Sequence, residues 1–208
     1  GSNGVYSVTV TANDGNGGTV DQMFTWTVTN PPPVANDDMQ SAAPETAVVV
    51  DLLVNDSDPD GDPLEVVDAT LADPTQGTLV RNPDGSYTFT SAPGVSGAVV
   101  INYTIRDQDG ATDSATHTVN VANQPPQLVD PDPTPGTPEI DPADPTNLIV
   151  PAVDNVPVSV DLDEYFTDPN TGDTLTITID PSDLPSWASF DPSTGVLSGT
   201  PPVDNTGP

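Results

Sequence analysis

The sequence contains neither cysteine nor lysine. The missing cysteines exclude disulfides and thiolate metal sites, and the missing lysines exclude Lys–Asn isopeptide crosslinks. No apolar run is long enough to cross a membrane, and no stretch has the features of a signal peptide. We therefore expect an internal part of a longer exported protein, held together by its core and by bound ions.

Basic residues are almost as scarce. Arg81 and Arg106 stand against 32 acidic residues, which gives a formal net charge of −30. Without a basic patch, the chain is not expected to bind nucleic acid or to associate with an anionic membrane. Its partners must be cationic, neutral or metal ions. Nearly all the acids are Asp, whose short side chain suits turns and calcium-binding loops, although a soluble protein of a halophile would show the same net charge.

Helical periodicity is also missing, whereas short alternating runs of Val, Thr and Ile are frequent. Such alternation allows one face of a strand to be buried while the other faces water. It argues against disorder, in spite of 26 Pro and 16 Gly residues. Short strands at regular spacing predict an all-β protein of the sandwich type.

Four segments follow one another along the chain. Residues 1–30 predict a hairpin with a turn at 13–18. Residues 31–126 predict one complete domain, with strands near 46–54, 64–70, 77–81, 86–90, 98–106 and 115–121. In its closing hairpin we expect the first strand, with Ile101, Tyr103 and Ile105, to pair with the second strand, with His117, Val119 and Val121. Residues 127–150 form a connector rich in Pro and Asp, and a new domain occupies 151–208, with strands near 156–162, 174–180 and 195–198.

Two internal repeats explain this order. An opening motif, Asp-Leu followed seven residues later by Asp-Pro, begins at Asp51 and again at Asp161. A closing motif begins at Tyr103 and again at Tyr6, and aligns Asp109-Gly110 with Asp14-Gly15.

Along the chain, a closing motif is therefore followed by an opening motif, and this order then occurs a second time. Residues 1–30 are then the C-terminal hairpin of one domain, and 151–208 the N-terminal part of another. We expect about one period of a tandem array, cut within a domain, although an arbitrary boundary would look the same.

The segment 51–64 concentrates negative charge. Acidic residues occupy every second position of its loop: Asp56, Asp58, Asp60 and Asp62. Such carboxylates repel one another unless a cation lies between them, and Asp-x-Asp-x-Asp-Gly is a pattern that wraps oxygen ligands around calcium. Pro59 lies inside the loop, and Val67 occupies the position where an EF-hand requires a bidentate Glu. The segment is therefore not an EF-hand. We interpret the segment as a calcium-binding loop at the end of a strand, with a solvated acidic turn as the alternative.

Three stretches resemble the tandem-95, or cadherin-like, repeats of giant bacterial surface adhesins. They are 33–38 (PVANDD), 52–64 (LLVNDSDPDGDPL) and 82–89 (NPDGSYTF). Residues 156–202 resemble the putative-Ig, or dystroglycan-type cadherin-like, repeats through 165–169 (YFTDP) and 184–201 (LPSWASFDPSTGVLSGTP). Residues 5–30 resemble the closing hairpin of that family.

The resemblance implies tandem Ig-like, cadherin-like Greek-key β-sandwiches with Ca²⁺ at the domain junctions. It also implies an extracellular, cell-surface role as an extender in an adhesin, a biofilm-matrix protein or a fibre. The candidate metal ligands, from the acidic clusters and this resemblance together, are Asp56, Asp58, Asp60, Asp62, Asp107, Asp109, Asp113, Asp37, Asp38, Asp14, Asp21, Asp163, Glu164, Asp168 and Asp173.

We do not expect an enzyme. The one histidine of the sequence, His117, aligns with Phe24 on a strand, which favours a packed side chain. Carboxylates in short turns are poor candidates for an acid with a raised pKa.

Two binding functions remain as alternatives. Trp26 and Trp187 would stack on surface glycans if exposed, although their phase with apolar neighbours favours core packing. Self-association is the other alternative. The closing hairpin of one subunit or repeat would complete the opening half of an identical neighbour head to tail, unless the two pieces pair within one chain.

Overall fold

The computed structural model describes residues 4–131, 137–141 and 144–203. Contacts divide the chain into two units, Gly1–Ala122 and Asn123–Pro208, and each is described by itself. In the described residues the regular elements are strands, apart from two short 3₁₀ turns, η1 (Pro74–Gln76) and η2 (Leu162–Tyr165). The prediction of an all-β protein is confirmed.

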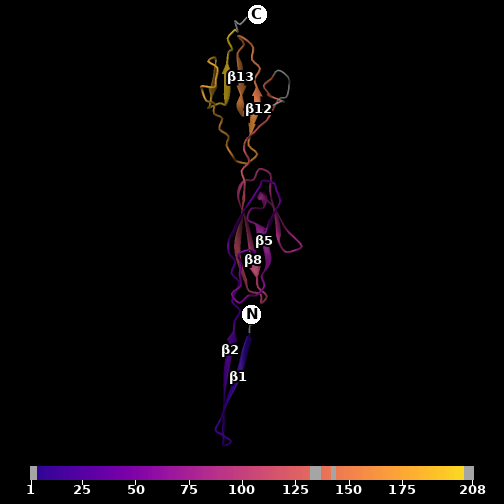
Figure 1. The fold of residues 1–208 in the computed structure, drawn as a ribbon, viewed down its shortest axis with the longest axis vertical. Coiled ribbons are helices and arrows are strands. Elements are labelled where there is room, and N and C mark those ends of the chain that lie inside the picture. Colours follow the sequence, from indigo (N-terminus) through magenta and orange to yellow (C-terminus); the bar gives the residue numbers. More distant parts are fainter. Residues whose placement is uncertain (1–3, 132–136, 142–143, 204–208) are drawn as a thin grey trace. The chain divides into compact units, whose positions relative to one another are not determined.

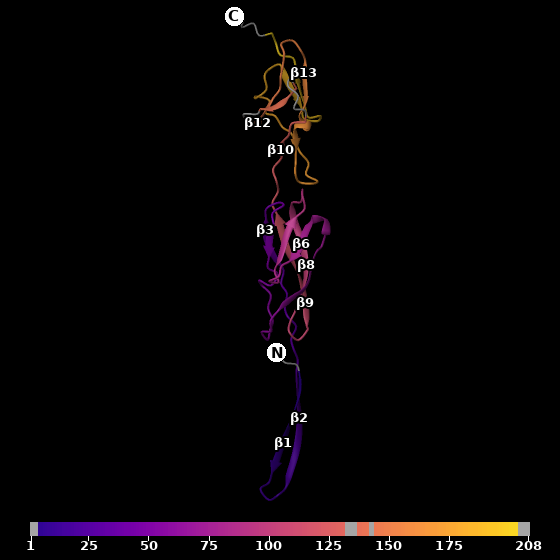
Figure 2. The same ribbon diagram turned by 90° about the vertical axis from the view of Figure 1, so that its right-hand side faces the viewer.

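The first unit contains a sandwich of two sheets (Figure 2). Its strands are β3 (Asp38–Ala42), β4 (Val48–Val50), β5 (Glu65–Leu71), β6 (Gly77–Arg81), β7 (Tyr87–Ser91), β8 (Gly97–Arg106) and β9 (Thr112–Val121). One sheet has the order β3-β9-β8-β5 and the other β4-β7-β6. All neighbours are antiparallel except β3 and β9, which are parallel. Because the chain changes sheet after β3, β4, β5 and β7, the fold is a Greek-key sandwich of the Ig type.

The core lies between the two sheets. Val99, Ile101 and Ile105 of β8 are completely buried, and Phe89 of the opposite sheet meets them in the same cluster. Alternate residues of β8 and β9 point away from this cluster and are mostly exposed or half-buried. The period of two that the sequence shows is therefore the period of burial.

Three details of the predicted strands need correction. The strand β3 was not predicted, because its residues are mostly polar and only Ala42 enters the core. The segment 46–54 is a strand only at 48–50, since the chain then turns. In the closing hairpin Ile101 does lie opposite His117, but Tyr103 lies opposite Ala115. The turn sets the register, and it leaves Val119 and Val121 opposite Val99 and Gly97.

The hairpin at the beginning of the chain is formed by β1 (Gly4–Asn13) and β2 (Thr19–Val28), as predicted (Figure 1). Its turn aligns Asp14 with Asp107, the first residue of the β8–β9 turn, rather than with Asp109. Its apolar side chains are exposed, including Phe24 at 51% and Trp26 at 70%. The expected core packing of Trp26 is therefore wrong for the described chain, because no second layer covers this hairpin there.

The second unit contains a smaller sandwich-like fold. Its strands are β10 (Gln127–Leu128), β11 (Glu139–Asp141), β12 (Asp144–Ile149), β13 (Val158–Asp161), β14 (Phe166–Thr167), β15 (Ala188–Asp191) and β16 (Val196–Gly199). The sheet β13-β16-β15 is accompanied by the pairs β10-β14 and β11-β12. Val160, Leu162 and Tyr165 form a small buried cluster.

The structure differs from the prediction for this unit in three places. The segment 174–180 belongs to no strand, although its residues alternate as a strand would. The strand β15 was not predicted, because its residues lack a run of β-branched side chains. The connector 127–150 contains the short strands β10, β11 and β12.

Phe89 tests the importance of the sandwich core. Truncation of this fully buried ring in Phe89→Ala should lower the free energy of unfolding by about 3–5 kcal/mol, because it removes apolar contact and leaves a cavity. Urea unfolding followed by circular dichroism measures the change. Val80→Ala, at a position that is 58% exposed on β6, is the control and should change stability by less than about 1 kcal/mol. A small loss in Phe89→Ala would contradict the assigned core.

Candidate metal centre

The loop between β4 and β5 brings three carboxylates together. One oxygen from each of Asp58, Asp60 and Asp62 lies within 4.8 Å of the others. Oδ1 of Asp58 accepts hydrogen bonds from the backbone N–H of Asp60 (3.0 Å) and of Asp62 (3.2 Å), so this side chain folds the loop around itself. Gly61 allows the sharp turn with a φ of 83°. Within the described residues no other cluster of three acidic or metal-binding side chains is this compact.

The three carboxylates carry like charges, which repel one another at this separation. The contact between the two carboxyl groups lowers the pKa of Asp58 and raises the pKa of Asp60, because a proton on one is shared with the other. Oδ2 of Asp58 is buried and accepts no hydrogen bond in the described part of the chain. Three hard oxygen donors and a buried oxygen without a donor fit a calcium ion.

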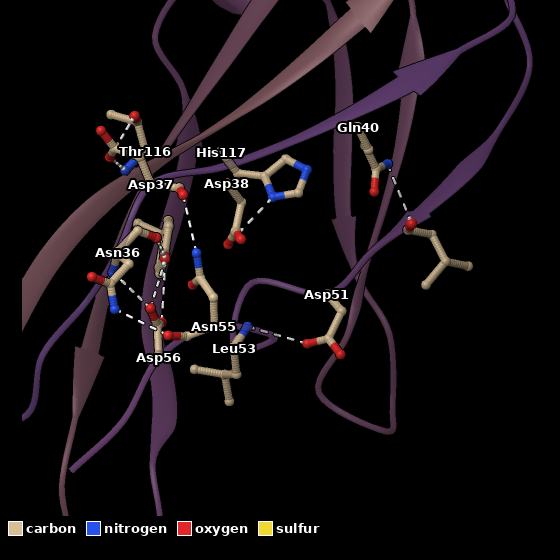
Figure 3. A network of polar contacts seen from close by, with 12 residues as sticks. Asn36, Asp37, Asp38, Gln40, Asp51, Leu53, Asn55, Asp56, Thr116 and His117 are labelled. Carbon is tan, nitrogen blue, oxygen red and sulfur yellow. Dashed lines mark hydrogen bonds and ion pairs between the residues drawn. The ribbon is translucent and has the colours of Figure 1, made fainter. Parts of the chain in front are cut away.

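A second polar network joins the segment before β3 to the start of the acidic loop (Figure 3). Asp56 Oδ1 accepts a hydrogen bond from the backbone N–H of Asn36 at 2.8 Å. The hydroxyl of Tyr103 donates to the carbonyl of Asn36 (2.9 Å) and lies 3.2 Å from both carboxylate oxygens of Asp56. Burial raises the pKa of Asp56, and the nearby charges of Asp38 and Asp113 raise it further. Asp56 is therefore tied to the protein itself, and it does not belong to the three-carboxylate cluster.

Asp38 faces His117 inside the sandwich (Figure 3). Their side chains are 8% and 3% exposed, and Asp38 Oδ2 lies 3.7 Å from His117 Nδ1. Burial lowers the pKa of His117, while the charge of Asp38 opposes that change. His117 is thus a packed residue of β9, as its alignment with Phe24 predicted.

Asp107, Asp109 and Asp113 do not form the compact cluster expected from their spacing. Asp107 is buried, and its Oδ1 accepts from the backbone N–H groups of Gly110 (2.6 Å) and Ala111 (2.8 Å). Asp113 accepts from the N–H of Ala35 at 2.9 Å, and Asp109 lies exposed in the turn.

Asp107 also binds the incoming chain. Its Oδ2 accepts a hydrogen bond from Asn30 Nδ2 at 2.6 Å. This carboxylate therefore closes the β8–β9 turn and holds the segment that follows β2.

The other candidates in the first unit serve turns and strand contacts. Asp37 Oδ1 accepts from the N–H and the hydroxyl of Thr116, both at 2.8 Å, and these bonds lower its pKa. Asp14 Oδ1 accepts from two N–H groups of its own turn, which lowers its pKa. Asp21 accepts from Thr11 across the hairpin at 2.5 Å.

The second unit repeats the first loop with one decisive change. Asp168 Oδ1 accepts from the N–H of Asn170 at 2.7 Å, as Asp58 does from Asp60. Here, however, the middle carboxylate is replaced by Asn170, which is buried and accepts from the N–H of Gln124 at 2.7 Å. The remaining candidates there are exposed and form no compact group in the described residues: Asp163, Glu164 and Asp173.

Sequence reasoning missed the role of Tyr103. This residue joins Asn36 to Asp56 through one hydroxyl, although the three lie far apart in the sequence. The alternation of β8 predicted its burial but not its partners. A tyrosine that alternates in step with fully apolar residues of a strand indicates a buried hydroxyl. Such a hydroxyl requires a hydrogen-bond partner, so this pattern can reveal a polar contact inside the core.

Comparison with protein families agrees with this architecture. Residues 30–123 match the family model of the bacterial cadherin-like domain. Residues 1–29 and 140–208 match that of the Putative Ig domain. The two matches support cadherin-like and Ig repeats of bacterial surface proteins. Repeats of these families are typical of extracellular surface proteins and are typically non-enzymatic. The comparison with curated proteins gave no significant match.

Three solved structures match this chain at low identity and low TM-score. The protocadherin gamma B4 extracellular domain is 14% identical with a TM-score of 0.44, and the match covers 98% of this chain and 35% of that one. An endo-fucoidan hydrolase of glycoside hydrolase family 107 is 19% identical with a TM-score of 0.36, covering 99% and 31%. A nucleoside hydrolase-related protein from Saccharophagus degradans is 21% identical with a TM-score of 0.35, covering 44% and 26%.

The chain thus spans about a third or less of the length of these structures. Fucoidan hydrolysis is the activity named for the endo-fucoidan hydrolase. Among the residues that the structure describes, no helix has the length and apolar character needed to cross a bilayer.

Tyr103→Phe tests the polar network around Asp56. Loss of the hydroxyl should destabilise the sandwich by about 1–2 kcal/mol, because the carbonyl of Asn36 and the carboxylate of Asp56 lose a buried donor. Chemical denaturation measures the loss. Tyr87→Phe is the matched control on the opposite sheet and should have a smaller effect. Equal effects of the two substitutions would contradict the assigned network.

His117 predicts a dependence of stability on pH. Burial lowers its pKa in the folded state, so stability is lost as the pH falls from the unfolded value, 6.5, toward the lower folded value. His117→Phe, which places the Phe of β2 at the equivalent position, should remove that loss. Thermal unfolding of both proteins between about pH 7.5 and about pH 5.5, one unit on either side of the ordinary histidine pKa, tests this. Parallel curves would refute the prediction.

Proposed function

We propose that this chain is a calcium-stabilised structural repeat of a bacterial cell-surface adhesin or of an extracellular fibre such as a biofilm matrix. In this proposal the repeats join head to tail by strand complementation. The observation that carries the calcium proposal is the cluster of Asp58, Asp60 and Asp62, in which the buried Oδ2 of Asp58 has no hydrogen-bond donor among the described residues. The cadherin-like family supports it, because such domains generally bind calcium.

The position of the cluster supports a role at the junction between repeats. Val34 and Ser57 exchange backbone hydrogen bonds of 2.8 and 3.1 Å, so the entering chain runs beside the acidic loop. Asn30 is tied to Asp107 at the same end of the sandwich. A cation here would cancel negative charge next to the entering chain and hold the loop against it. This would stiffen the connection that an extender repeat needs.

Calcium should raise the thermal stability of the chain. Extracellular calcium modules bind at roughly 10⁻⁴–10⁻³ M. At about a hundred times the dissociation constant, one site adds about 2.7 kcal/mol, which corresponds to a rise of about 10 °C or more in a domain of this size. Calorimetry in calcium and in chelator, at the same ionic strength, measures the shift.

Charge-matched variants separate binding from general screening. Asp60→Asn removes a charge and a ligand from the cluster, and should reduce the calcium-dependent shift to a small fraction. Asp68→Asn removes a charge from an exposed position on β5 outside the cluster and should keep the shift. Equal midpoints of the unmodified protein in calcium and in chelator would overturn the calcium proposal and leave the acids as a solvated surface.

Glycan binding is the second candidate function. The 70% exposure of Trp26 favours it, because an exposed indole can stack on a sugar ring. Its place on an open two-stranded hairpin, rather than in a groove, favours the structural proposal. Trp26 fluorescence titrated with acidic and neutral polysaccharides distinguishes the two: a saturable change in a monomeric protein supports glycan binding.

A further inference from the structure

The hairpin β1–β2 has the architecture of the hairpin β8–β9. In each, two ten-residue strands pair along their whole length without a bulge. Each turn begins with an aspartate, Asp14 or Asp107, whose Oδ1 accepts two backbone hydrogen bonds. The fourth residue of each turn is a glycine in the left-handed backbone conformation, Gly17 with φ 97° or Gly110 with φ 96°. The two hairpins are therefore equivalent position by position.

Their inward faces differ in what covers them. Ile101 and Val119 are completely buried, because the sheet β4-β7-β6 packs over them. The equivalent residues of the first hairpin, Val8 and Trp26, are 44% and 70% exposed. The hairpin β1–β2 thus carries the apolar face of a sandwich strand pair without the opposite sheet. A two-stranded hairpin alone is at best marginally stable in water.

The second unit has the complementary pieces. Its sheet β13-β16-β15 repeats the antiparallel order of β4-β7-β6. The chain enters it in the same way, since β10 pairs with β14 as Val34 pairs with Ser57. Asp161 accepts from the N–H two residues later, as Asp51 does. In the described residues from 123 to 203, however, no strands correspond to β5, β8 and β9.

The segment 174–180 occupies the position of β5 in the sequence of this unit. It follows the Asp168 loop, as β5 follows the Asp58 loop. Leu175, Ile177 and Ile179 are half-buried and alternate with exposed polar residues. The pattern is that of a strand, yet the segment has no strand partner in the described chain. In the complete sandwich, β8 is the partner of β5.

We infer that β1 of one copy pairs antiparallel with 174–180 of a second copy of this chain. The register follows from the complete domain, in which Val66 lies opposite Ile105. The equivalent residues are Ile177 and Ala12, which come to lie opposite each other. The apolar face of the hairpin then covers the small core around Val160 and completes a second Greek-key sandwich. That the Putative Ig domain matches both pieces supports this pairing.

The geometry of the complete sandwich favours a second copy over closure within one chain. Asn30 is held at the turn end of the β8–β9 hairpin, whereas the chain leaves from Val121 at the opposite end of β9. Ten strand residues separate these points by about 30 Å. Closure within one chain would require the residues that follow Val121 to run back along the sandwich. Pairing between copies requires no such return, and it propagates as a head-to-tail filament.

This inference rests on the proposed head-to-tail function, and its first test is association. Light scattering in calcium at moderate salt should show a mass that rises with concentration in multiples of one chain. In a Trp187→Phe background, the fluorescence of Trp26 should shift to the blue on the same concentration scale, because the indole becomes buried.

Two variants of β2 locate the interface. Phe24→Asp places a charge on the inward face and should weaken association about a hundredfold or more. Met23→Asp places the same charge on the outward face, where the side chain is 63% exposed, and should leave the mass distribution much closer to that of the unmodified protein. A monomer at every concentration, or equal effects of both substitutions, would overturn the inference.

Cysteine crosslinking tests the register and the partner. The natural sequence has no cysteine, so Ala12→Cys and Ile177→Cys give single reactive thiols. After mixing and mild oxidation, the two variants should form a mixed disulfide, whereas Thr9→Cys, on the outward face, should not crosslink with Ile177→Cys. A disulfide formed only inside the doubly substituted monomer would show closure within one chain and refute the second copy. Calcium-dependent stabilisation that persists without association would leave the metal proposal intact while this inference fails.

Discussion

A β-hairpin with one apolar face requires a second layer, and this constraint underlies both units of the protein. In the complete sandwich, β8 and β9 bury Ile101 and Val119 against the opposite sheet. The burial of apolar surface is the main favourable contribution to such a fold, and lysine and cysteine are not available to replace it by covalent links. Where the second layer is missing from the described chain, as at β1–β2, the same pattern of side chains lies exposed to water.

The large negative charge imposes a second constraint. Several aspartates accept backbone hydrogen bonds in their own turns, and such bonds lower the pKa of Asp14, Asp84 and Asp191. Asp58 does this with one oxygen only, while the other is buried beside two more carboxylates. Turn formation thus accounts for many of the acids, whereas the cluster at Asp58 has an excess of charge that turn formation does not explain.

The two constraints meet at the end of the sandwich where the chain enters. Asn30, Val34 and Asn36 are each held there by a residue of the loop or the turn: Asp107, Ser57 and Asp56. The second unit repeats this design through Gln124 and Asn170 but lacks the middle carboxylate. The protein therefore uses hydrogen bonds at both entrances and concentrates charge at one of them.

The sequence by itself determined the all-β class, the paired hairpins, the repeated Asp-Leu motif and the buried positions of β8. Each of these depends on local alternation or on turn chemistry, which a single stretch of chain contains. Tertiary structure decided which aspartates meet. Asp107 and Asp113 are neighbours in sequence but bind different backbone segments, whereas Asp56, Asn36 and Tyr103 converge from distant parts of the chain. It also decided that 174–180 is not a strand in the described chain, because a strand requires a partner as well as a pattern.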